Sequence, residues 1–187
     1  MHSSPILPYR HHKGFTLLET IVGIVVLAIS LSVLTTFIYP VAQQSAEQLH
    51  QVKAAELAQS MLNEITNKAF DENSDMAGGR LRCGETAAPS CSLGMAPEVI
   101  LGEIETRATF NDVDDYNNLD YDVGEIENSQ GQVLDLYFGY AMSISVYNDA
   151  NYDGSYTGNN STAKLITVTI ITPTDFSMRF STYRANF

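Results

Sequence analysis

A single apolar stretch near the amino end constrains this chain more than any other feature. Residues 15–39 carry no charge except that of Glu19, which lies near the start of the stretch. At about 1.5 Å per residue, a helix of this length can cross the roughly 30 Å hydrocarbon core of a bilayer. A carboxylate in lipid is costly and usually serves a function. The sequence therefore predicts a transmembrane helix over residues 15–39, with Glu19 as its first candidate functional residue.

The basic residues flanking the stretch predict its orientation. Arg10 and Lys13 precede it, and the first basic residue after it is Lys53. The positive-inside bias then puts the amino end in the cytoplasm and the bulk of the chain outside. A secretory signal peptide would have a shorter apolar core that ends at small residues. A generic single-pass anchor would explain the length of the stretch but not Glu19.

The sequence HHKGFTLLET, residues 11–20, resembles the class III signal of type IV prepilins and pseudopilins. In that family a prepilin peptidase cuts between the residues equivalent to Gly14 and Phe15 and methylates the new amino terminus. The resemblance implies a leader over residues 1–14. It also implies that Glu19 acts in assembly, by pairing with the charged terminus of Phe15 on an adjacent subunit. The alternative is a protonated Glu19 that faces a neighbouring helix and has no role.

The helical pattern continues beyond the apolar stretch and becomes amphipathic. Pro40 removes a backbone donor and should kink or loosen the helix there. Apolar side chains then recur every three or four residues, at Leu49, Val52, Ala55, Ala58, Leu62, Ile65 and Ala69. This periodicity predicts an amphipathic helix over residues 40–70, with one face packed on a globular domain.

Residues 71–187 are predicted to form that globular domain. Residues 71–135 are mostly irregular, with short strands expected at 99–101 and 106–110. Alternating or continuous apolar residues predict strands at 140–147, 164–172 and 177–183. The chain is thus expected to be α+β, and three consecutive strands favour an antiparallel sheet. The resemblance to type IV pilins supplies the full picture, a long amino-terminal helix packed on a carboxyl-terminal antiparallel sheet.

Two cysteines, Cys83 and Cys91, lie close together in the sequence. Outside the cytoplasm they are expected to form one short-loop disulfide. The alternative is a pair of buried free thiols in a cytoplasmic protein, which the predicted orientation disfavours.

The segment between the first two clear strands resembles the opening of a calcium loop. Its candidate oxygen ligands are Asp149, Asn151, Asp153 and Ser155. Gly154 occupies the sixth position, where a sharp turn is needed. The twelfth position is Asn160 and not a bidentate glutamate, so the match is partial. The alternative is a polar hairpin loop without a metal.

The charge balance excludes some functions. The chain has 10 Lys and Arg against 22 Asp and Glu, a net charge of −12, so no binding to nucleic acid is expected. The acidic segment 112–122 could bind a cation, but a solvated loop is the preferred interpretation. Three of the four histidines precede Phe15, and no catalytic group suggests an enzyme.

Segments further along the chain resemble the MshD-type minor pilins of mannose-sensitive haemagglutinin (MSHA) pili. They are KAAELAQSMLNEITNKAFDENSD, DVDDYNNL and VYNDANYDG. This resemblance implies a minor structural subunit that acts in pilus assembly or at the tip. Its partners would be prepilin peptidase, other pilins and the inner membrane. The globular domain would be periplasmic before incorporation into an extracellular pilus. The alternatives are a pseudopilin of a type II secretion system and an adhesin displayed on the filament.

Overall fold

The computed structural model describes residues 14–76, 80–100 and 102–187. The predicted leader therefore lies outside the described residues, apart from Gly14. The chain divides into two compact units between Ala46 and Glu47. We refer to them as the amino-terminal unit and the globular unit.

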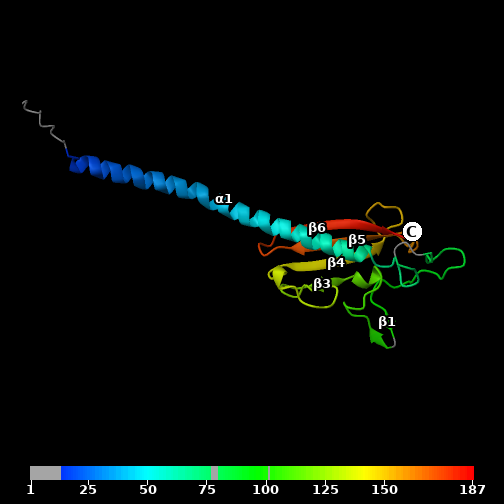
Figure 1. Ribbon diagram of the computed structural model, residues 1–187. Coiled ribbons are helices and arrows are strands. Elements are labelled where there is room, and N and C mark those ends of the chain that lie inside the picture. The colour runs from blue at the N-terminus through cyan, green and yellow to red at the C-terminus, as the bar shows by residue number, and fades with distance from the viewer. Residues whose placement is uncertain (1–13, 77–79, 101) are drawn as a thin grey trace, which may run out of the picture. The chain divides into compact units, whose positions relative to one another are not determined.

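The amino-terminal unit consists mainly of the first part of α1, a helix that spans Leu17–Thr66 (Figure 1). Its segment Leu17–Thr36 is long and apolar enough to cross a membrane and is unburied within the protein. Helical structure continues through Pro40, so the proline does not end the helix. The sequence-based prediction of one long helix with an apolar first half is confirmed.

The globular unit contains a four-stranded antiparallel sheet in the order β3-β4-β5-β6 (Figure 1). The strands are β3 (Leu119–Tyr121), β4 (Ala141–Asn148), β5 (Ala163–Ile171) and β6 (Ser177–Ala185). Each strand pairs with the next along the chain, and Ile144 of β4 lies opposite Val168 of β5. The second part of α1 packs on this sheet, which confirms the predicted α+β class.

Smaller elements lie between the helix and the long strands. Strands β1 (Val99–Ile100) and β2 (Glu103–Ile104) form a hairpin, and η1 (Asp114–Tyr116) and η2 (Asp135–Tyr137) are single 3-10 turns. Residues 106–110 form a turn and not a strand, because the Thr109 side chain and backbone bond back to Thr106. That part of the prediction was wrong.

The buried face of α1 differs from the predicted stripe at its beginning. Leu49 and Val52 are 58% and 56% exposed. The face that meets the sheet instead includes His50, whose Nδ1 lies 2.8 Å from the Tyr140 hydroxyl. Periodicity of apolar residues alone missed this polar position. The buried helix residues are Ala54, Leu57, Ala58, Met61, Leu62 and Ile65.

The helix ends at Thr66, before the predicted boundary at residue 70. Ala69 forms a parallel bridge with Asp112, supported by backbone bonds from Ala69 N to Asn111 O and from Val113 N to Ala69 O. This pairing with a distant segment takes the backbone of Ala69 out of the helix. Local sequence signals could not predict it.

Candidate functional site

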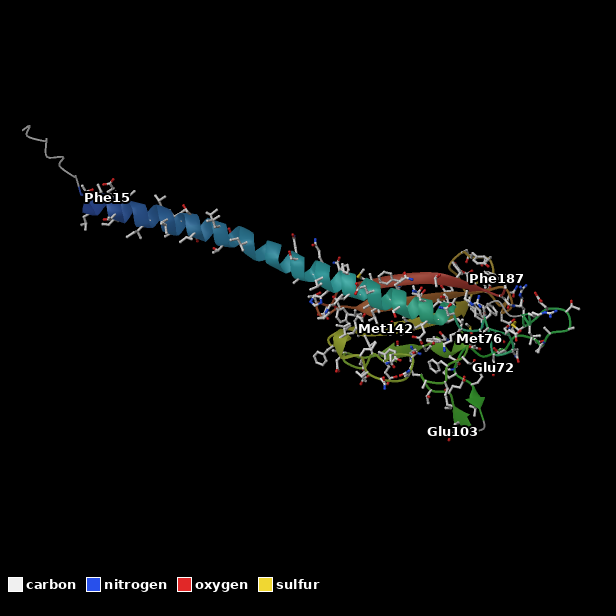
Figure 2. The ribbon with its side chains drawn as sticks, viewed as in Figure 1. Phe15, Glu72, Met76, Glu103, Met142 and Phe187 are labelled. Atoms are coloured by element: carbon white, nitrogen blue, oxygen red, sulfur yellow. A yellow bond between two sulfur atoms is a disulfide. The ribbon has the colours of Figure 1, made fainter. Side chains whose placement is uncertain are left out.

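The start of α1 carries the residues predicted for processing and assembly. Gly14 and Phe15 are exposed and lie before the helix, separated from its first residue by Thr16, and Figure 2 shows Phe15 at this end. The Thr16 side-chain oxygen accepts a hydrogen bond from the Glu19 backbone N–H at 3.2 Å, so Thr16 caps the helix. The pattern Thr-x-x-Glu before an apolar run is a capping-box signature that the sequence reasoning did not use.

Glu19 therefore occupies the third position of the helix, where the positive end of the helix dipole favours a carboxylate. Among the residues that the structure describes, none donates a hydrogen bond to the Glu19 side chain. Hydroxyls deeper in the segment do have partners within the helix, since Ser30 donates to Val26 O at 2.8 Å and Thr36 to Val33 O at 2.6 Å. The Glu19 carboxylate is thus free to accept a partner from outside the chain. The roles of Gly14, Phe15 and Glu19 stay predictions.

The disulfide between Cys83 and Cys91 is present, with their Cα atoms 4.7 Å apart, as predicted. The short loop that it closes is held at the end of the sheet. Asn186, which follows β6, donates from Nδ2 to the carbonyl of Cys83 at 3.0 Å, and Asn160 donates to the carbonyl of Ser92 at 2.8 Å. The bond therefore fixes a segment that the last residues of the chain also contact.

The predicted calcium ligands Asp149, Asn151, Asp153 and Ser155 lie together in the loop between β4 and β5. Asp149 is buried, and its oxygens accept hydrogen bonds from Asp153 N, from Gly154 N at 2.8 Å and from the Tyr183 hydroxyl at 2.7 Å. Burial alone would raise the pKa of Asp149, but these donors lower it below its usual range. A cation at Asp149 would have to compete with these donors.

The rest of the loop is also internally bonded. Asn151 Nδ2 donates to Asp153 Oδ2 at 2.8 Å, and Ser155 N donates to Asp153 Oδ1 at 2.9 Å. These bonds are typical of a polar hairpin loop without a metal. The structure brings the four residues together, and calcium binding by them stays a prediction.

The first acids of the segment 112–122 are buried, so its interpretation as a solvated loop was wrong for them, whereas Asp120 and Asp122 are exposed. Asp112, Asp114 and Asp115 are at most 1% exposed. Lys164 of β5, itself 1% exposed, donates to Asp114 Oδ2 at 2.6 Å and to the Phe70 carbonyl at 2.7 Å. Burial raises the pKa of Asp114 to about 6, although Lys164 partly offsets that effect.

Lys164 was missed at the sequence level although its position carried a signal. It shares the alternation of Ile166, Val168 and Ile170 along β5, and all of these side chains are buried. A lysine on the buried face of a strand requires an anionic partner. The strand pattern therefore predicts a buried acid, but not which one.

A second ion pair, within the globular unit, joins the end of α1 to the segment that follows β2. Arg107 Nη1 lies 2.6 Å from Glu64 Oε1, and the Tyr116 hydroxyl donates to the same oxygen at 2.9 Å. Burial would raise the pKa of Glu64, but the hydrogen bond and charge of Arg107 outweigh it and lower the pKa. The three side chains satisfy one another's charge and hydrogen-bonding groups, so we assign this contact a structural role.

Comparison with known protein families supports the predicted prepilin-type signal at the amino end. The family model of the prokaryotic N-terminal methylation motif matches residues 9–35. The comparisons with curated proteins and with solved structures found no match. The chain thus carries a prepilin-type motif that includes Gly14, Phe15 and Glu19. The match does not extend to the globular unit and does not confirm the narrower MshD-type resemblance.

Proposed function

We propose that this chain is a minor structural subunit of a type IV pilus of the MSHA type. In this proposal it is processed by prepilin peptidase and then acts in pilus assembly or at the tip. The observation that carries the proposal is the methylation motif at residues 9–35, which overlaps the membrane-length segment Leu17–Thr36. The α+β globular unit that follows fits a pilin-like subunit.

The geometry at the start of α1 supports cleavage first and pairing with a neighbouring subunit second. Cleavage after Gly14 would leave the amino group of Phe15 next to the helix start that Thr16 caps. The Glu19 carboxylate lies in the first turn of the same helix and accepts no hydrogen bond from any described residue. In lipid, such a carboxylate is stabilised best by a cation. The methylated terminus of a neighbouring subunit would supply that cation.

We assign the chain a structural and not an enzymatic role. His50 is the single histidine among the described residues, and its Nδ1 is occupied by the Tyr140 hydroxyl. The pairs Lys164–Asp114 and Arg107–Glu64 are committed to holding the fold.

Processing provides the direct test. The full chain is co-expressed with a prepilin peptidase, and intact mass and amino-terminal sequence are measured. We expect a mature chain that begins with N-methylated Phe15, and we expect Gly14→Val to leave the precursor uncut. Gly94→Val is the matched control, because a side chain there also meets nothing within 4 Å. A mature terminus elsewhere, or normal cleavage of Gly14→Val, would refute the processing step.

Deleting the gene for this chain in its host distinguishes a pilus subunit from a secretion-system subunit. Loss or shortening of surface pili supports the proposal. A defect in protein secretion with normal pili would instead identify a type II secretion pseudopilin.

A further inference from the structure

The β1–β2 hairpin places two glutamates against each other. Glu98 and Glu105 flank its strands, and Glu105 N donates to Glu98 O at 2.9 Å. In return, Glu98 N donates to Glu105 Oε2 at 3.2 Å. Like charges directly opposite each other destabilise a strand pair. The hairpin therefore holds two carboxyl groups close together, and only that of Glu105 accepts a hydrogen bond from the described residues of the hairpin itself.

Two buried aspartates, Asp112 just before η1 and Asp115 within it, each accept hydrogen bonds from the described residues on only one carboxylate oxygen. Asp112 Oδ1 accepts from Asp114 N at 2.7 Å, and Asp115 Oδ2 accepts from Asn111 N at 2.7 Å. The other oxygens, Asp112 Oδ2 and Asp115 Oδ1, are buried and have no hydrogen-bond partner among the described residues. Glu98 Oε2 is in the same state. Three orphaned carboxylate oxygens in one region are costly.

These carboxylates converge. Oxygens of Glu98, Glu105 and Asp115 lie within 4.8 Å of one another, and so do oxygens of Glu98, Asp112 and Glu72. Glu98 belongs to both groups, which makes the acids one connected cluster. Glu72 is exposed and Glu98 is half-buried, so the cluster opens to solvent on that side.

Among the described residues, no Lys or Arg forms an ion pair with Glu98, Glu105, Asp112 or Asp115. Lys164 pairs with Asp114 and Arg107 with Glu64, although the charge of Lys164 also acts on Asp112. Burial, followed by the neighbouring carboxylates, raises the pKa of Glu98 to about 8 and that of Asp112 to about 7. A bound cation would offset the cost of keeping these carboxylate oxygens buried and without hydrogen-bond partners.

We propose that Glu98, Glu105, Asp112 and Asp115 form a calcium site, with Glu72 at its solvent side. Calcium takes 6–8 oxygens in flexible geometry, so the carboxylates and a few waters complete its shell. Ligands that come from a hairpin and a separate turn suit calcium better than magnesium, which demands near-ideal octahedral geometry. The ion would join the β1–β2 hairpin to the segment that contains η1. The inference does not depend on the pilus assignment and concerns other residues than the loop at 149–155.

The test uses Glu98→Gln in the full chain, purified in detergent. A ligand that binds only the folded state raises the melting temperature, so calcium should raise that of the wild type relative to chelator. In chelator, Glu98→Gln should melt above the wild type, because it removes a carboxyl that stays among other carboxylates only by repelling them or by holding a proton. In calcium that order should reverse, and the affinity measured by titration calorimetry should fall by about tenfold or more.

Two variants serve as controls. Glu103→Gln makes the same charge change at an exposed position of the same hairpin, at the tip that Figure 2 shows well away from Glu72. Glu103→Gln should melt close to the wild type in chelator, and calcium should raise its melting temperature as it does for the wild type. Asp153→Asn alters the loop at 149–155 and should leave the Glu98-dependent binding intact. Magnesium at the same concentration should produce a smaller shift than calcium.

Three results would overturn the site. The first is a wild-type chain for which calorimetry detects no heat of calcium binding and calcium does not change the melting temperature. The second is a Glu98→Gln chain that binds calcium as the wild type does. The third is loss of all binding in Asp153→Asn, which would put the ion in the other loop. Asp115→Asn, which keeps an oxygen acceptor in the turn, should reproduce the affinity loss of Glu98→Gln.

Discussion

Replacing Lys164 with methionine should destabilise the globular unit strongly and in a pH-dependent way. The substitution keeps most of the side-chain volume but removes the ammonium group from Asp114 and from the Phe70 carbonyl. Asp114 would keep only a 3.5 Å contact with the Ser92 hydroxyl on that oxygen. Removing one partner of a buried ion pair costs about 3–5 kcal/mol. At roughly 2–4 °C per kcal/mol for a domain of this size, the melting temperature should fall by about 6–20 °C.

The pH dependence follows from Asp114. Its pKa in the folded protein is about 6, against roughly 3.9 in an unfolded chain. Between these values the folded state binds the proton more tightly, so this group stabilises the fold as pH falls and loses that contribution as pH rises. Without Lys164 the pKa should rise further, because the attraction that favours the ionised form is gone. The loss of stability should therefore be largest near pH 8 and smaller near pH 5.

The assay is thermal and urea unfolding of the full chain in detergent and chelator, followed by circular dichroism at both pH values. Lys53→Met is the matched control, since Lys53 makes no ion pair among the described residues and should change stability little. The double variant Lys164→Met with Asp114→Asn should recover about 2 kcal/mol of the loss, because it no longer buries an unpaired carboxylate. Equal losses at pH 5 and pH 8, or strictly additive effects in the double variant, would refute the reasoning.

Two further predictions concern the membrane helix and the disulfide. Glu19→Ala should still insert into the membrane, because it removes a polar penalty in lipid, but should be scarce in sheared pili on immunoblots. Ser30→Ala is its control, and normal incorporation of Glu19→Ala would exclude the pairing role. Replacing Cys83 and Cys91 together with serine should lower the unfolding free energy by about 2–3 kcal/mol, as expected for so short a closed loop. Native protein that labels with a thiol reagent in the absence of reductant would contradict the bond.

The elements predicted correctly are those whose signals are local. The apolar run of α1 and the alternation of Met142, Ile144 and Val146 in β4 each follow from one continuous segment. The cysteine pair was also local, because the two residues are eight positions apart. The three-residue strand β3 has too short a pattern to be separated from the irregular sequence around it.

The candidate cation cluster could not be predicted, because its members come from segments that meet only in the folded chain. Asp112 and Asp115 look like solvated acids in the sequence. In the fold, Asp112 pairs with Ala69 and Asp115 lies near Glu98 and Glu105, which are distant in the sequence or separated from it by a turn. Thr16 is the opposite case. Its capping of the helix was predictable from its spacing to Glu19, so there the missed signal was local.

The contacts that close the globular unit have a consequence for how the chain reaches its fold. His50 meets Tyr140 across 90 residues, and Lys164 meets Phe70 across 94. Contacts between such distant positions require a large loss of chain entropy before they return any energy, whereas Cys83 and Cys91 can meet early. The face of α1 that packs on the sheet therefore stays exposed until β4 and β5 have been synthesised and have folded against it. Because these contacts join distant positions, the globular unit is expected to fold more slowly than α1 or the loop closed by the disulfide.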